Sequence, residues 1–155
     1  MIDSELNLNR LRSSEILYLF VSRLLGNISK RFAMICNSLV VANPSTNNFS
    51  GEIGSSINGF PKLEYVDMSS NSLTENLPFG FRRFKEFAVC ENLLNDQLHS
   101  WVFSESYSLE ALHLSENALI GKIPTTISNC KNLAIFNEWG NYLFGNIQGE
   151  LESSS

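Results

Sequence analysis

The chain has 155 residues, 43% of them hydrophobic and 17% charged, which is a globular composition and excludes an intrinsically disordered chain. Its net charge of -5 argues against a nucleic-acid partner, because such a partner requires clustered lysine and arginine. The cysteines Cys36, Cys90 and Cys130 are odd in number and form no CxxC pair, so we expect no disulfide framework, no metal site and no cofactor.

The most apolar segment near the N-terminus, residues 16–25, is interrupted by Ser22 and Arg23. It is shorter than the about 20 apolar residues that a membrane-spanning helix needs. Acidic residues precede it, and no clean small-residue cleavage site follows it, so it does not resemble a signal peptide either. We therefore identify neither a membrane span nor a targeting segment in this sequence.

One template recurs along the chain, and its clearest copy begins at Leu109 and reads LxxLxLxxNxLxGxIPxxIxxC. Copies start near residues 14, 39, 63, 84, 109 and 133. The same slot holds an asparagine in five copies, namely Asn47, Asn71, Asn92, Asn117 and Asn141. This shared phase predicts a repeat domain over residues 14–151, preceded by a degenerate segment 1–13 and followed by a tail 152–155.

Each copy predicts the same elements in chain order. A short strand comes first, and its fourth and sixth template positions, such as Leu112 and Leu114, point inward together. The asparagine follows, where its side chain can satisfy backbone groups that a turn leaves unpaired. Glycine and proline then allow a tight path into an irregular or short helical return. One copy cannot bury its own apolar face, so five or six parallel strands should stack around one continuous core that includes Val66 and Met68.

The segment Gly121-Lys122-Ile123-Pro124 after the asparagine resembles the plant-specific class of leucine-rich repeat. That class is typical of the ectodomains of plant receptor-like kinases, receptor-like proteins and polygalacturonase inhibitors. The resemblance implies a curved right-handed solenoid of five to six repeats, with a short parallel sheet on its concave face.

The resemblance also implies a function, which is binding a peptide or protein ligand at the extracellular side of the plasma membrane, with a co-receptor ectodomain as another candidate partner. An inhibitor or scaffold protein similar to the polygalacturonase inhibitors and a non-functional truncated receptor product remain alternatives. No enzyme is expected, because the chain has no Gly-rich loop, HRD or DFG motif of a kinase.

Outward positions of the strands are expected to form the ligand-binding face. Aligning the copies gives four outward columns, the last of which contains Val21, Thr46, Ser70, Glu91, Glu116 and Gly140. Carboxylates on this face favour an extended peptide with lysine or arginine, and exposed aromatic side chains often anchor interfaces. The alternative is an ordinary solvated face. The candidate ligand-binding residues are Tyr65, Asp67, Glu91, His113, Glu116, Asn137 and Trp139.

Two N-glycosylation sequons are present, Asn27-Ile28-Ser29 and Asn48-Phe49-Ser50. Both fall in or beside the asparagine turn, which should be surface in a solenoid, so Asn27 and Asn48 are candidate glycosylation sites.

Overall fold

The computed structural model describes residues 14–19, 23, 25–26, 37–53, 57–79 and 81–145, and every structural statement below concerns these residues. The predicted N-terminal segment 1–13, the tail 152–155 and the boundary at residue 151 lie outside them. So do the candidate glycosylation site Asn27 and the cysteine Cys36.

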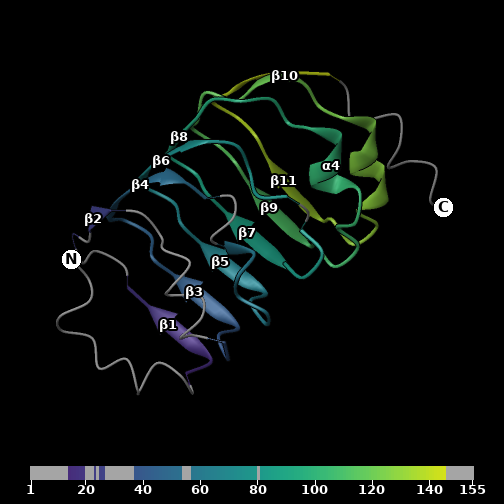
Figure 1. Cartoon of the computed structure of the whole chain (residues 1–155). Coiled ribbons are helices and arrows are strands. Elements are labelled where there is room, and N and C mark those ends of the chain that lie inside the picture. Colours follow the sequence, from purple (N-terminus) through teal and green to yellow (C-terminus); the bar gives the residue numbers. More distant parts are fainter. Residues whose placement is uncertain are drawn as a thin grey trace.

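The chain winds into a solenoid whose coils lie side by side, each contributing one strand to a six-stranded parallel sheet (Figure 1). The strands follow the order of the chain across the sheet. They are β1 (Ile16–Tyr18), β3 (Val41–Asn43), β5 (Tyr65–Asp67), β7 (Glu86–Ala88), β9 (Ala111–His113) and β11 (Ile135–Asn137). The prediction of five or six short parallel strands on one side of a solenoid is confirmed, and we call the outer surface of this sheet the concave face.

A continuous apolar core runs through the coils behind this sheet. Val66, Met68, Leu112 and Leu114 are at most 2% exposed and belong to one cluster, which confirms the predicted inward positions. In the middle coils three phenylalanine rings pack together with centroids 4.8–5.8 Å apart. Because each coil covers the apolar residues of its neighbours, burial joins the coils into one cooperative structure.

The repeated asparagines join each coil to the one before it. Four of them accept, through Oδ1, a backbone N–H of the preceding coil at 2.9–3.0 Å. All five donate through Nδ2 to carbonyls of their own turn at 3.0–3.3 Å. They also donate to a carbonyl of the preceding coil at 2.6–3.1 Å. The predicted role of asparagine in satisfying the turn is confirmed, and the bonds between coils are an addition that the pattern did not predict.

A second run of parallel strands follows the asparagine turns and was not predicted. It contains β2 (Leu25–Gly26), β4 (Asn48–Glu52), β6 (Ser72–Glu75) and β8 (Leu93–Leu94), and beyond them β10 (Ile120–Lys122) and β12 (Tyr142–Phe144). An isolated bridge between Gln97 and Ile120 links the two groups. The helical returns that the pattern did predict appear as α4 (Ser100–Phe103) and the 3-10 helix η1 (Thr125–Asn129).

Each described coil has one residue with left-handed backbone shortly after its strand in the long sheet. These residues have φ between 52° and 73° and are Arg23, Thr46, Ser70, Glu91, Glu116 and Gly140. The expectation that Glu91 and Glu116 stand on strands is therefore wrong, because the strands end before them and the chain turns there.

The first coil also differs from the expected alignment. Leu17 pairs with Ala42, whereas Leu25 pairs with Asn48, so the first coil has two more residues between strand and turn than the second. This insertion puts Arg23 in the left-handed slot that the alignment gave to Val21, which lies outside the described residues.

Candidate functional site

The structure brings the predicted site residues to one side of the solenoid, in two rows. Tyr65, Asp67, His113 and Asn137 stand on strands of the long sheet and are half-buried. The other three, Glu91, Glu116 and Trp139, lie beyond the ends of the strands and are exposed. The concave face thus consists of a half-buried row along the strands and an exposed row along the turns.

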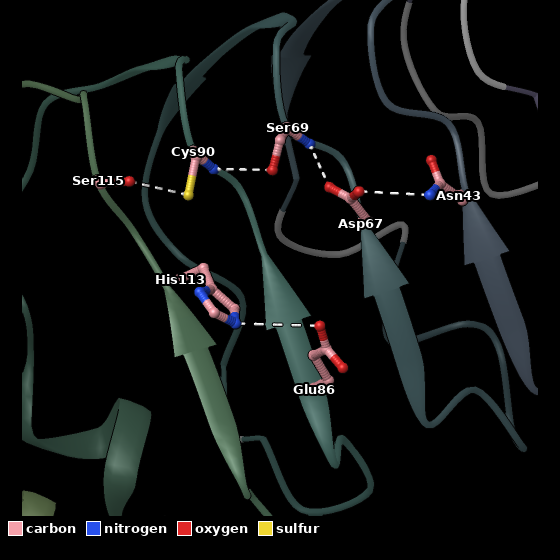
Figure 2. A network of polar contacts seen from close by, with 7 residues as sticks. All are labelled: Asn43, Asp67, Ser69, Glu86, Cys90, His113 and Ser115. Carbon is pink, nitrogen blue, oxygen red and sulfur yellow. Dashed lines mark hydrogen bonds and ion pairs between the residues drawn. The ribbon is translucent and has the colours of Figure 1, made fainter. Parts of the chain in front are cut away.

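A chain of polar contacts crosses four coils of this face (Figure 2). The two carboxylate oxygens of Asp67 accept hydrogen bonds from Asn43 Nδ2 at 3.3 Å and from the backbone N–H of Ser69 at 3.0 Å. Ser69 Oγ accepts from the backbone N–H of Cys90 at 3.1 Å. Ser115 Oγ donates to Cys90 Sγ at 3.1 Å. The carboxylate of Asp67 therefore holds two coils together, and its place in the site is that of a positioning residue.

The next coil provides a second carboxylate, Glu86, whose contact on this face is with His113. Glu86 Oε1 lies 3.9 Å from His113 Nε2, and the two side chains are 52% and 25% exposed (Figure 2). The strand residues beside them in the register are Ala111 and Ala88, which are both buried. Glu86 is not among the candidate site residues predicted from the sequence, so the structure adds it.

The exposed row presents two further carboxylates. Glu91 Oε2 accepts a hydrogen bond from Ser70 Oγ at 3.0 Å, which fixes it against the adjacent turn. Glu116 occupies the equivalent left-handed position in the next coil. With Glu86 these groups give the middle of the concave face a negative potential, which attracts cationic side chains from solution.

Tyr65 already interacts with a cation of this chain. Lys85 Nζ lies 5.7 Å from the centroid of the Tyr65 ring and 2.8 Å from Glu64 Oε2. The hydrogen bond and charge of Glu64 raise the pKa of Lys85, with a smaller contribution from Tyr65. Lys85 therefore already gives the Tyr65 ring one cationic neighbour within the chain.

The described part of the chain contains no group of three or more histidine, cysteine, aspartate or glutamate side chains that could hold a metal ion. None of the helices in these residues is long and apolar enough to cross a membrane. The two described cysteines, Cys90 and Cys130, are free thiols. Burial raises the pKa of Cys130 to about 11, so this thiol stays protonated near neutral pH.

Comparison with known proteins agrees with this geometry. The family model described as Leucine Rich Repeat matches residues 62–84 and 108–130. A probable leucine-rich-repeat receptor-like serine/threonine-protein kinase of Arabidopsis thaliana is 43% identical over 130 residues, which are 84% of this chain and 12% of the kinase. The chain belongs to the plant leucine-rich-repeat family.

Similar solved structures are ectodomains of plant receptor kinases. The ectodomain of the Arabidopsis thaliana receptor kinase GASSHO1/SCHENGEN3, crystallised with CASPARIAN STRIP INTEGRITY FACTOR 2, matches with a TM-score of 0.78 and 29% identity over 90% of this chain. The Arabidopsis receptor kinase HAESA, crystallised with the peptide hormone IDA and the co-receptor SERK1, matches with a TM-score of 0.71 and 30% identity over 81% of this chain.

This leucine-rich-repeat chain spans 17% of the GASSHO1/SCHENGEN3 structure and 21% of the HAESA structure, so it corresponds to a small part of each. The matched regions are leucine-rich-repeat ectodomains, which are not catalytic.

Proposed function

We propose that this chain is a ligand-binding segment of a plant cell-surface receptor, that its repeat domain occupies residues 14–151, and that it binds rather than catalyses. The similar ectodomains bind peptides, as in the complex of HAESA with IDA. The similarity to ectodomains of membrane receptor kinases also supports an extracellular location for this segment, and the presence of SERK1 in the HAESA complex supports a co-receptor ectodomain as a second partner.

The observation that carries the proposal is the set of carboxylates around the small residues of the concave face. Glu86, Glu91 and Glu116 are all exposed, while Ala88 and Ala111 beside Glu86 are 8% exposed and have no bulk. An extended peptide can cross this face and place a lysine or arginine between the exposed carboxylates. His113 beside Glu86 supplies a further polar contact, and Asn137 and Trp139 continue the surface on the next coil.

The experiment begins with selection of binding peptides from a random displayed library on the purified chain. The chosen peptide is then titrated against Glu86→Gln, Glu116→Gln and the double variant. We expect the double variant to bind about fivefold or more weakly, a loss of about 1 kcal/mol or more, as for interface hot spots. Binding should also weaken as ionic strength rises, because charges on an open face are screened by salt.

Arg82→Gln with Arg83→Gln is the matched control, because both arginines are exposed and contact Glu105 and the carbonyl of Asn58, neither of which belongs to the concave face. The proposal is wrong if the control abolishes binding while the double variant binds like the parent. Asp67→Asn is a separate test of positioning, since Asn retains the acceptor for Ser69 N–H and should preserve folding and most of the binding.

We also propose a glycan on Asn48. Asn48 and Ser50 are both exposed on β4, while Phe49 between them is 3% exposed, so the sequon presents its acceptor and its hydroxyl to solvent. Expression through a plant secretory pathway should give a product whose mass falls on enzymatic deglycosylation, and the loss should shrink in Asn48→Gln. Equal mass losses in parent and variant would exclude this site.

A further inference from the structure

A second surface of the solenoid, outside the polar chain of Figure 2, carries three stacked aromatic rings. Trp101, in α4, stacks with both Phe79 and His99, with ring centroids 5.5 Å and 5.0 Å away and interplanar angles of 23° and 17°. Phe79 is 69% exposed. His99 stands at the template position that holds Pro78 in the preceding coil and Pro124 in the following coil. The stack therefore presents aromatic area to solvent that the core does not use.

Asp96 borders this stack at His99 and interacts with a group of carboxylates that includes Glu75 and Glu52. Asp96 Oδ2 lies 3.7 Å from His99 Nε2. Glu75 is close enough to Glu52 and Asp96 that its pKa is raised, first by a hydrogen bond with Glu52, then by the charge of Glu52, and less by burial and by Asp96. Within the described ranges, no lysine or arginine lies at ion-pair distance from these three carboxylates.

Besides the repulsion from neighbouring carboxylates, the backbone conformation of Glu75 is unfavourable to folding. Glu75 has φ 67°, in the template slot that holds Gly51 at φ 83° and Gly121 at φ 88°. Left-handed backbone is unfavourable for a side chain with a Cβ atom and costs glycine nothing. The fold would be satisfied by glycine at this position, so neither the strain nor the charge repulsion is required by folding.

The same chain contains a complete example of what such a surface can hold. On the concave side, Lys85 Nζ lies over the Tyr65 ring and 2.8 Å from Glu64 Oε2, so a ring and a carboxylate together bind one ammonium group. The stack at Trp101 provides the rings and the carboxylates, and the cation has to come from elsewhere.

We propose that the surface formed by Glu52, Glu75, Phe79, Asp96, His99 and Trp101 docks a lysine- or arginine-bearing segment of a partner protein. A cationic side chain on the free face of Phe79 gains a cation–π contact, and the adjacent carboxylates accept its hydrogen bonds. The negative charge of the border disfavours phosphate groups and anionic membranes as occupants. This surface is separate from the concave face, so the inference does not depend on the proposed peptide site.

The fluorescence of Trp101 gives a direct test. The chain has two tryptophans, Trp101 and Trp139, so a Trp139→Phe background isolates the signal of the stack. The probe is a short arginine-rich peptide, with the same peptide bearing citrulline in place of arginine as the uncharged control. We expect a saturable change in fluorescence with the arginine peptide, a weaker one in high salt, and none with the citrulline peptide.

Variants then assign the binding to this surface. Phe79→Ser and Glu75→Gln should each weaken the arginine peptide about threefold or more, the range of a cation–π contact at a surface. Phe144→Ser removes a similarly exposed ring on β12 and should have no effect on the Trp101 signal. Circular dichroism of each variant verifies folding, which Glu75→Gln retains because it changes only the charge.

Two results would overturn the inference. Equal responses to the arginine and citrulline peptides would mean that the charge of the probe is not recognised. Loss of binding in Glu86→Gln, with Phe79→Ser and Glu75→Gln unaffected, would assign the peptide to the concave face and would leave the proposed function standing.

Discussion

Replacing Asn92 by alanine tests whether the asparagines hold the coils together. The Asn92 side chain is 7% exposed, and its Oδ1 accepts the backbone N–H of Leu73 in the preceding coil at 2.9 Å. Its Nδ2 donates at 3.1–3.2 Å to three carbonyls, those of Met68, Val89 and Cys90. Alanine removes all four hydrogen bonds at once.

The structure shows which of these losses is costly. Each of the three carbonyls keeps another donor, namely Asn71 Nδ2, Asn117 Nδ2 or the N–H of Ser70. The N–H of Leu73, a residue that is 0% exposed, loses its acceptor, and a buried unsatisfied donor costs about 1–3 kcal/mol. Adding a few tenths to about 1 kcal/mol for each weakened carbonyl contact, we expect a loss of about 3 kcal/mol in the free energy of unfolding.

Urea denaturation followed by circular dichroism measures this loss. The control is Asn132→Ala, because Asn132 is exposed and donates one hydrogen bond, to the carbonyl of Tyr107 at 2.8 Å. It should cost less than about 0.5 kcal/mol, as surface substitutions usually do. If the two variants lose the same stability, with unchanged dependence on urea concentration, the asparagine bonds do not carry the cohesion between coils.

Three further predictions follow from burial and charge. Cys130 has a folded pKa of about 11 against an ordinary value of 9.0, so its contribution to stability is complete below pH 9.0 and is lost as pH rises toward 11. The difference between the urea midpoints of parent and Cys130→Ala should therefore be constant below pH 9.0 and shrink between pH 9.0 and 11; a difference that stays constant across that window would contradict this. Glu75→Gly should raise the midpoint of thermal unfolding, because glycine adopts the left-handed backbone at this position without strain. Thr74→Gly in the same strand should lower that midpoint. If both variants unfold at a lower temperature than the parent, backbone strain at Glu75 does not destabilise the fold. The last described coil exposes three aromatic side chains, Trp139, Tyr142 at 72% and Phe144, so the chain expressed alone should self-associate. Tyr142→Glu should shift the sedimentation profile toward monomer. A concentrated parent that stays monomeric would contradict this prediction.

The long sheet and the core could be predicted from the sequence because their determinants are local and repeated. A strand that alternates inward and outward residues places Leu112 and Leu114 in the core wherever the repeat phase is known. The asparagine slot fixes that phase in five copies. The repeat period was enough to assign the strands and the core positions, because equivalent positions in successive coils are buried in the same way.

The second run of strands could not be predicted in the same way. Its strands are paired by backbone hydrogen bonds between successive coils, and they are two to five residues long, as in β4, where Phe49 is the one buried residue. Backbone pairing leaves no pattern in a single copy. The left-handed positions did leave one signal, Gly140, in a column that otherwise holds Ser70, Glu91 and Glu116. A glycine aligned with polar residues after a strand indicates a turn.

The candidate site illustrates a different limit, which concerns what outward side chains already do for the fold. Asp67 and Glu86 are both acidic and both outward on adjacent strands, so the sequence gives no reason to separate them. In the structure Asp67 bonds to Asn43 and Ser69, whereas Glu86 has only the imidazole of His113 at 3.9 Å. A carboxylate that already accepts hydrogen bonds within the fold gains less from binding a ligand, because the ligand would have to replace those bonds.

The same reasoning ranks the whole concave face. Tyr65 is engaged by Lys85, and Glu91 by Ser70, so each already has one contact within the chain. Glu86 and Glu116 hold their charge in solvent with fewer bonds to the fold, and removing either should weaken a cationic ligand without weakening the solenoid. Binding and stability should therefore separate cleanly at Glu86 and Glu116 and remain coupled at Asp67, which is the difference between a recognition residue and a positioning residue on the same sheet.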